Sequence, residues 1–263
     1  MQTFRAASPM EQFEIIRLVD LSLGSIDISL TNSAVWMLIC TGAIIAFFAI
    51  ATRRAAIIPN RLQSMAEVLY EFVSDLVRDT IGTEGRKFFP YVFTRFLWIL
   101  IANLFGLIPT LPGLPHAAHT FTTTSHLVVT LALSMLTITI VIVYGFWKNG
   151  LGFLKLFAPS GVPPVMYILL VPIELVSFLS RPLSLAIRLF ANMFAGHIIL
   201  KLFAGFVVSL IGAGGVLSVM GLLPFLGAVA VTALEFLVAF LQAYVFAILT
   251  CIYLSDAAHA ADH

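Results

Sequence analysis

The sequence predicts an all-α polytopic membrane protein with about five to six membrane helices, the last two long and strongly tilted, plus amphipathic surface helices. Three observations support this fold class. Of the 263 residues, 60% are hydrophobic and only 10% are charged, about half the charge of an ordinary soluble domain. Residues 33–52 and 127–147 contain no charged residue, and each stretch is long enough to cross the hydrocarbon core. The stretches 163–208 and 221–254 are apolar and too long for one upright crossing.

Composition also excludes several classes of function. The net charge is +1, from 14 basic and 13 acidic residues, so there is no electrostatic case for nucleic acid. Cys40 and Cys251 lie in apolar stretches, which favours buried thiols over a disulfide or a metal site. No Gly-x-x-x-x-Gly-Lys-Ser/Thr motif is present. We therefore expect no catalytic site of the chain's own, no cofactor and no metal.

The whole chain, 1–263, is interpreted as a single membrane domain that begins with an amphipathic segment, 1–32. Within that segment, residues 9–23 are expected to form a short surface helix. Acids in the same region argue against a signal peptide; they are Glu11, Glu14 and Asp20. The part 33–147 then supplies three spans, at about 33–52, 88–108 and 126–147. An amphipathic helix at about 60–82 follows the first of them, because its acids recur at helical spacing opposite an apolar side.

The part 163–254 is expected to form a long tilted hairpin. A helix of ~40 residues is ~60 Å long, about twice the hydrocarbon thickness. Such a helix must tilt or bend, and Pro172 and Pro182 are the candidate bend points. Three glycines break the apolar pattern between the two arms; they are Gly212, Gly214 and Gly215.

Loop charge predicts the orientation of the spans. The connections 53–87 and 148–162 carry lysine and arginine, whereas 109–125 carries neither. Basic connections stay on the inner side of a membrane. The N-terminus is therefore expected outside and the C-terminus inside.

An arginine lies in the middle of the long apolar segment, and it dominates the functional interpretation. Arg188 cannot lose its proton in a protein, and a charge at the centre of a membrane helix costs at least ~2.5–3.5 kcal/mol. At ~100° per residue, several polar residues fall within ~40° of Arg188 on the same helix; these are Glu174, Arg181, Ser184 and Asn192. Glu235 and Gln242 share a face of the last helix, and His197 falls opposite Arg188 on its own helix.

Two interpretations of these polar residues stay open. Hydrogen bonds between helices explain many polar side chains in membrane bundles. For Ser184, Asn192 and Gln242 this explanation stands equal to a role in a proton path. Ionisable groups in a membrane more often mark a proton or ion path, which favours a path through Glu174 and Glu235. A lone His197 could be a satisfied polar residue, but a titrating pair with Glu235 is the better hypothesis.

Two runs of sequence identify a known family. The first is Leu-Ser-Leu-Ala-Ile-Arg-Leu-Phe-Ala-Asn-Met-Phe-Ala-Gly-His over 183–197, and the second is Leu-Gln-Ala-Tyr-Val-Phe-Ala-Ile-Leu-Thr-Cys-Ile-Tyr-Leu over 241–254. Both closely resemble the a-subunit family of F-type ATP synthases. The resemblance covers about 102–256 and is strongest over 172–254.

The resemblance implies a stator subunit of a membrane motor, in which two long tilted helices face the c-subunit ring. Arg188 would then be the essential arginine that faces the rotor carboxylate and separates two offset proton half-channels. Asn192, His197, Glu235 and Gln242 match the half-channel on the positive side, and Glu174 with Ser184 matches the negative side. Thr-Ser-His126 also resembles mitochondrial and related bacterial members, so His126 is expected to contribute to the outer entry.

One departure bears on the site. Many bacterial members carry glutamate at the position of His197 and histidine at that of Glu235, and here the two are exchanged, as in mitochondrial-type sequences. The exchange keeps one acid and one imidazole, which supports a shared site. The implied partners are the c-subunit ring, peripheral-stalk b subunits, other ATP synthase subunits, the lipid bilayer and the translocated H⁺. The expected location is a bacterial inner membrane, with the mitochondrial inner membrane as the alternative.

Two rival functions fit the sequence less well. A secondary transporter that binds an anion through Arg188 predicts an internal repeat, and the first half holds no second Arg-x-x-x-Asn segment. A purely structural scaffold leaves the cost of Arg188, Glu174 and Glu235 in the membrane unexplained.

Overall fold

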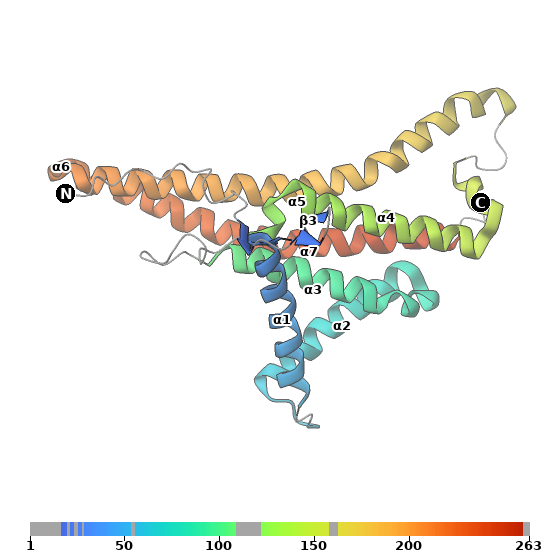
Figure 1. The fold of residues 1–263 in the computed structure, drawn as a ribbon, viewed down its shortest axis with the longest axis horizontal. Coiled ribbons are helices and arrows are strands. Elements are labelled where there is room, and N and C mark those ends of the chain that lie inside the picture. Colours follow the sequence, from blue (N-terminus) through green and yellow to red (C-terminus); the bar gives the residue numbers. More distant parts are fainter. Residues whose placement is uncertain are drawn as a thin grey trace. The chain divides into compact units, whose positions relative to one another are not determined.

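The computed structural model describes residues 17–19, 22–23, 26–27, 29–53, 56–108, 122–157 and 163–259, and these are almost entirely helical (Figure 1). The helices are α1 (Asn32–Thr52), α2 (Arg61–Ile81), α3 (Phe89–Gly106), α4 (Leu127–Asn149), α5 (Pro164–Ala213), α6 (Gly215–Met220) and α7 (Leu222–Ala258). Within this described part, five helical segments are long and apolar enough to cross a membrane; they are Asn32–Thr52, Phe89–Gly106, Leu127–Asn149, Val165–Ala213 and Gly215–Ala258. The predicted fold class is confirmed.

The N-terminal segment differs from the expected surface helix over 9–23. Residues 9–16 lie outside the described residues, whereas Arg17–Val19 (β1) and Ser22–Leu23 (β2) are short strands. They pair antiparallel with Leu30–Thr31 (β4) and Ile26–Asp27 (β3) respectively. Leu23 pairs with Ile26, so only Gly-Ser separates the two strands, and such a dipeptide favours a tight hairpin over a helix.

Helix α2 confirms the amphipathic helix predicted at about 60–82. Its N-cap is Asn60, whose side chain accepts a hydrogen bond from the Gln63 backbone N–H at 2.8 Å, and it ends at Gly82 with φ 79°. The apolar face buries Ala66, Val73 and Val77, whereas its acids are exposed. Caps at both ends and one buried face fix the length of this helix.

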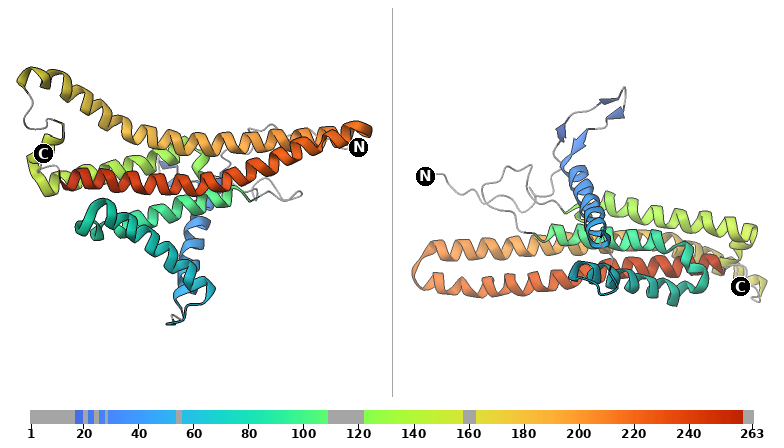
Figure 2. Two further views of the ribbon diagram at one scale, coloured as in Figure 1. Left: turned by 180° about the vertical axis from the view of Figure 1, so that it is seen from behind. Right: turned by 90° about the horizontal axis from the view of Figure 1, so that it is seen from below.

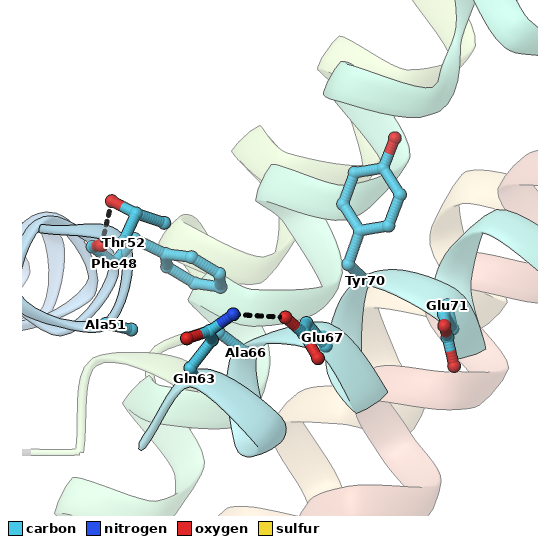
Figure 3. Close-up of a pocket in the computed structure, with 8 residues that line it drawn as sticks. All are labelled: Phe48, Ala51, Thr52, Gln63, Ala66, Glu67, Tyr70 and Glu71. Atoms are coloured by element: carbon cyan, nitrogen blue, oxygen red, sulfur yellow. Dashed lines mark hydrogen bonds between the residues drawn. The ribbon is translucent and has the colours of Figure 1, made fainter. Parts of the chain in front are cut away.

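A pocket of about 240 Å³ lies between the end of α1 and the start of α2 (Figure 3). Phe48, Ala51, Gln63, Glu67 and Tyr70 are among the side chains that line it. The Gln63 side chain donates to Glu67 Oε1 at 2.8 Å and to the Ala56 carbonyl at 3.0 Å. Gln63 therefore ties the connection between the two helices to the surface of α2.

The chain forms two compact units that share the long helices. Unit 1 comprises 1–43, 100–126 and 189–241, and unit 2 comprises 44–99, 127–188 and 242–263. In unit 1, the end of α5 and the start of α7 lie side by side (Figures 1 and 2). Gly227 packs closely against the ring of Phe203, because a Cβ added at Gly227 would lie 3.0 Å from that ring. Gly214 and Gly215 have φ of 72° and 60°, a conformation that glycine adopts without strain, and they end α5 as the sequence predicts.

The continuous 50-residue α5 is ~75 Å long at the α-helical rise. This exceeds twice the ~30 Å hydrocarbon core, so the helix must cross the membrane at a steep tilt. Pro172 and Pro182 lie inside it, and Figure 1 shows the helix changing direction in this yellow-to-orange part. Proline removes a backbone donor and clashes with the preceding turn, which accounts for the bend.

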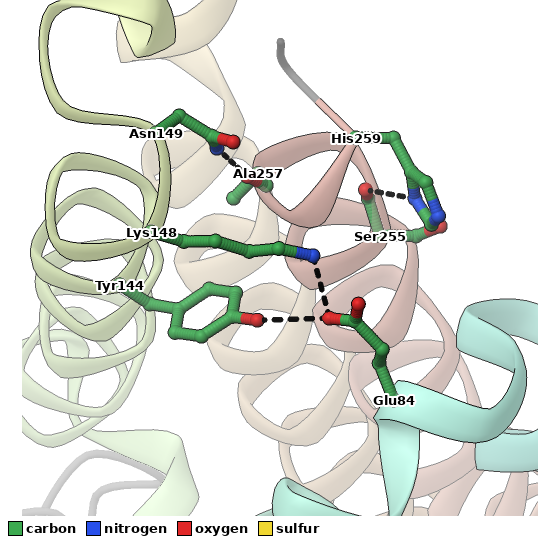
Figure 4. Close-up of polar contacts among 7 residues, drawn as sticks. All are labelled: Glu84, Tyr144, Lys148, Asn149, Ser255, Ala257 and His259. Atoms are coloured by element: carbon green, nitrogen blue, oxygen red, sulfur yellow. Dashed lines mark hydrogen bonds and ion pairs between the residues drawn. The ribbon is translucent and has the colours of Figure 1, made fainter. Parts of the chain in front are cut away.

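Unit 2 is held together at one end by polar contacts between helices (Figure 4). Lys148 Nζ lies 2.6 Å from Glu84 Oε2 in the 3₁₀ helix η2 (Gly82–Lys87), and the Tyr144 hydroxyl donates to the same oxygen at 3.3 Å. Asn149 donates to the Ala257 carbonyl of α7 at 2.7 Å. The Lys148 ammonium lowers the pKa of the Glu84 carboxyl below its usual 4.5.

The Glu84–Lys148 pair predicts a pH-dependent contribution to stability. Because the pKa of Glu84 is lowered in the folded protein, the contribution is present above about pH 4.5 and is lost as the pH falls through the lowered value. We expect Glu84→Gln to lower the melting temperature of the purified membrane sector by no more than about 2 °C at pH 7, because the pair is exposed. The difference from wild type should shrink at pH 4.

The control is Glu71→Gln, which removes an exposed acid of α2 and should change the melting temperature at neither pH. An equal effect of Glu84→Gln at pH 7 and pH 4 would contradict this account of the ion pair.

Candidate functional site

Arg188 lies on the exposed face of α5, where the neighbouring side chains are apolar. Leu183 and Ile187 are 48% and 45% exposed, and Ser184 and Asn192 are exposed on the same side as Arg188. The opposite face is buried through Leu185, Ala186, Leu189 and Met193. Within the described part of the chain, Arg188 makes no hydrogen bond and no ion pair. Of the polar residues predicted to share a face with Arg188, Ser184 and Asn192 are therefore exposed beside this unneutralised cation.

Arg181, two turns earlier on α5, has the opposite environment. Its guanidinium lies 3.1 Å from Asp256 Oδ2 and 3.6 Å from Glu174 Oε1. It also lies over the ring of Tyr253, 5.1 Å from the centroid. Its side chain is 21% exposed. The two carboxylates and the aromatic ring all stabilise the partly buried guanidinium. This arginine is therefore neutralised within unit 2. Glu174, predicted for a proton path, is one of its partners.

A second group of polar side chains is buried in unit 1. The Thr122 hydroxyl lies 2.8 Å from His197 Nε2, and both residues are buried, His197 with 9% exposed. Thr122 precedes the 3₁₀ helix η4 (Thr123–Ser125), and its carbonyl accepts from the Ser125 hydroxyl at 2.6 Å. The histidine is thus bonded to a turn whose side chains are themselves buried.

Asn103 joins the same turn to two helices. It is fully buried, its Oδ1 accepts from the Thr124 hydroxyl at 2.7 Å, and its Nδ2 donates to the Ala239 carbonyl at 3.3 Å. An amide at this depth requires hydrogen-bond partners, and here the protein supplies one to the oxygen and one to the nitrogen. The structure favours a packing role for Asn103.

Glu235 is a buried acid of unit 1 that lacks a hydrogen bond at one carboxyl oxygen among the described residues. It is 5% exposed, and its Oε2 has no hydrogen-bond partner among the described residues. The carboxyl group lies against Gly196, where a Cβ would collide with Glu235 Oε1. Gly196 directly precedes His197, so the acid and the imidazole belong to adjoining parts of one buried region. Their titration as a pair stays a prediction.

Gln242 is buried on α7. His126 is half-buried and directly precedes α4, and burial lowers the pKa of its imidazole below the usual 6.5.

Sequence reasoning missed two residues of these clusters, Thr122 and Asp256. The run of hydroxyl side chains before His126 was a signal for the first. An acid near the end of the last apolar segment was a signal for the second. In both cases the partner is 75 residues away in the sequence, and only the fold pairs them.

Comparison with known proteins decides the family. Residues 34–255 match the family model described as ATP synthase A chain. The chain belongs to the ATP synthase A chain family. It is 57% identical over 258 residues to "ATP synthase subunit a" of Hyphomonas neptunium, covering 98% of each chain. It is 55% identical over 251 residues to the protein of that name from Mesorhizobium japonicum (95% and 96% covered). The match to that of Maricaulis maris is 54% over 253 residues (96% and 97%).

Membership of the ATP synthase A chain family makes this chain a membrane-sector subunit of an F-type ATP synthase, engaged in ATP synthesis and proton transport. The relatives named above are bacterial. With five helical segments able to cross a membrane among the described residues, the chain is a multi-pass inner-membrane protein. All the residues predicted for the proton path, from His126 to Gln242, lie inside the matched region.

The contact between Glu235 and Gly196 leads to a prediction. Gly196→Ala places a methyl group where the carboxyl group lies, so Glu235 must move. If Glu235 carries protons, ATP-driven proton pumping in inverted membrane vesicles should fall by about 10–100-fold, the effect expected of a displaced reacting group. Glu235→Asp in the same chain shortens the acid and should restore part of the activity.

The matched control is Gly205→Ala on the same helix, where a Cβ meets nothing within 4 Å. It should pump as wild type does. Wild-type pumping by Gly196→Ala would show that the position of Glu235 does not matter.

Proposed function

We propose that this subunit is the stator of the membrane motor: it provides two offset proton half-channels and the essential arginine that couple proton flow to rotation of the c-subunit ring. The observation that carries the proposal is the environment of Arg188. Its charge is exposed among apolar side chains and has no hydrogen-bond or ion-pair partner in the described part of the chain.

The energetics of Arg188 require a partner from outside those residues. A charge at the centre of a membrane helix costs at least ~2.5–3.5 kcal/mol, whereas an ionised carboxylate on a neighbouring subunit would offset this cost. Arg188 would hold such a carboxylate deprotonated. Once protonated, the carboxyl group is no longer attracted and can move into the lipid. Arginine cannot itself relay the proton, which suits a group that separates two paths.

The positive-side path is assigned to Asn192, His197, Glu235 and Gln242, with His126 at its outer entry. Support comes from burial, because His197 of α5 and Glu235 of α7 are both ionisable groups buried in unit 1. Burial raises the pKa of a carboxyl toward neutral pH, and a neutral imidazole can accept or pass on a proton at its ring nitrogens. Glu235 Oε2, which has no hydrogen-bond partner among the described residues, has a lone pair available for that exchange.

The negative-side path is assigned to Glu174 and Ser184. Both lie on α5 in unit 2, with Glu174 half-buried beside Arg181. Arg181 has a second acid in Asp256, so its charge does not depend on Glu174 alone.

The proposed assembly follows the same lines. The partners are the c-subunit ring, the peripheral-stalk b subunits and the other ATP synthase subunits, and the translocated ion is H⁺. Both basic connections, 53–87 and 148–162, belong to unit 2, as does the end of α7. Basic connections face inward, which supports an N-terminus outside and a C-terminus inside.

The test is Arg188→Ala in the intact ATP synthase. We expect ATP-driven proton pumping to be lost while the complex still assembles, because Arg188 makes no contact that holds the described fold together. Pumping is measured in inverted vesicles, and co-purification with the ring proteolipids in mild detergent measures assembly.

The control is Arg78→Ala, an exposed arginine of α2 that pairs only with Asp75 and Asp79 among the described residues. It should assemble and pump as wild type does. Normal pumping by an assembled Arg188→Ala enzyme would overturn the proposed function.

A further inference from the structure

We infer that Thr122 is a positioning residue for proton transfer at His197. The inference rests on the proposed function, since it matters only if His197 lies on the positive-side path. The Thr122 hydroxyl is 2.8 Å from His197 Nε2, and both side chains are buried. In the sequence, the only signal for Thr122 is that three more hydroxyl residues follow it.

The position of the Thr122 side chain is fixed from three directions. A Cβ at Gly106 of α3 would come within 2.8 Å of the Thr122 Cβ and closer still to its hydroxyl. Its carbonyl is held by the Ser125 hydroxyl at 2.6 Å. The next turn is anchored through Thr124 to the buried Asn103 at 2.7 Å. A hydroxyl held this firmly fixes the orientation of the ring that it bonds, as outer hydrogen bonds do for functional histidines.

A hydroxyl also suits a partner whose protonation changes. It accepts a hydrogen bond when Nε2 carries a proton and donates one when Nε2 is bare. The same contact therefore survives both states of the imidazole after rotation of one O–H bond. An amide or carbonyl partner with a fixed donor or acceptor would lose the bond in one of the two states.

This role is separable from simple packing. Thr122→Val keeps the shape of the side chain and removes the hydroxyl, so the buried Nε2 loses this bond. Bonds to a charged ring are stronger than bonds to a neutral one, so the loss changes the balance between the two states. A change in packing alone would lower the rate by the same factor at every pH.

The experiment measures the pH dependence of ATP-driven proton pumping by the intact ATP synthase in inverted vesicles. We expect Thr122→Val to lower the pH of half-maximal pumping by about 0.5–1 unit, because the protonated ring loses the stronger hydrogen bond, and to lower the maximum several-fold. Thr122→Ser should retain the wild-type profile. The control is Thr250→Val, which removes a buried hydroxyl that donates to the Phe246 carbonyl of its own helix at 2.7 Å and should shift nothing.

His197→Ala separates the inference from the proposed function. If His197→Ala pumps as wild type does, His197 is not on the path and the positive-side assignment fails together with the inference. If His197→Ala is defective but Thr122→Val has the wild-type pH profile, or a lower rate without a shift, only the positioning role is overturned.

Discussion

The cost of a permanent charge in hydrocarbon is the constraint on which this structure depends. Two arginines lie seven residues apart on α5, and they have different surroundings. Arg181 is neutralised by Asp256 and Glu174 and packs on Tyr253. Arg188 has no such partner among the described residues. Because desolvating an unpaired charge costs several kcal/mol, the proposed function gives Arg188 a partner on another subunit, whereas Arg181 has its partners within unit 2.

The buried polar groups of unit 1 divide in a similar way. Asn103 and Thr124 satisfy each other and the Ala239 carbonyl, so they tie helices together without need of a ligand. Glu235 keeps one carboxyl oxygen unpartnered among the described residues. A satisfied network contributes rigidity, whereas an unsatisfied buried acid needs an explanation beyond packing. In the proposed function that explanation is proton exchange, which rigid surroundings would allow to occur at a fixed place.

Most of the fold could be predicted because backbone groups in a membrane must bond within a helix, so hydropathy reveals each span. The helix over 61–81 was predictable from its spacing of acids, and the break at Gly214 from composition. The strands at Arg17–Val19 and Ser22–Leu23 were not, because an amphipathic pattern so short fits both structures. Arg188 stands out in the sequence by its charge alone. Its difference from Arg181 depends on Asp256, which only the packing of α7 brings near.

Close approach between segments links the packing of unit 1 to its chemistry. Thr122 lies against Gly106, and Glu235 lies against Gly196, each in space that a Cβ would fill. The hydroxyl that contacts His197 and the carboxyl group that lies against the residue before it are thus each packed on a glycine of a neighbouring element. Small residues let membrane helices approach closely, and here the space they leave is occupied by a hydroxyl and a carboxyl. Glycine at these positions is therefore a requirement of the site as well as of the fold, since a methyl group would displace the polar group before it disturbed the helix.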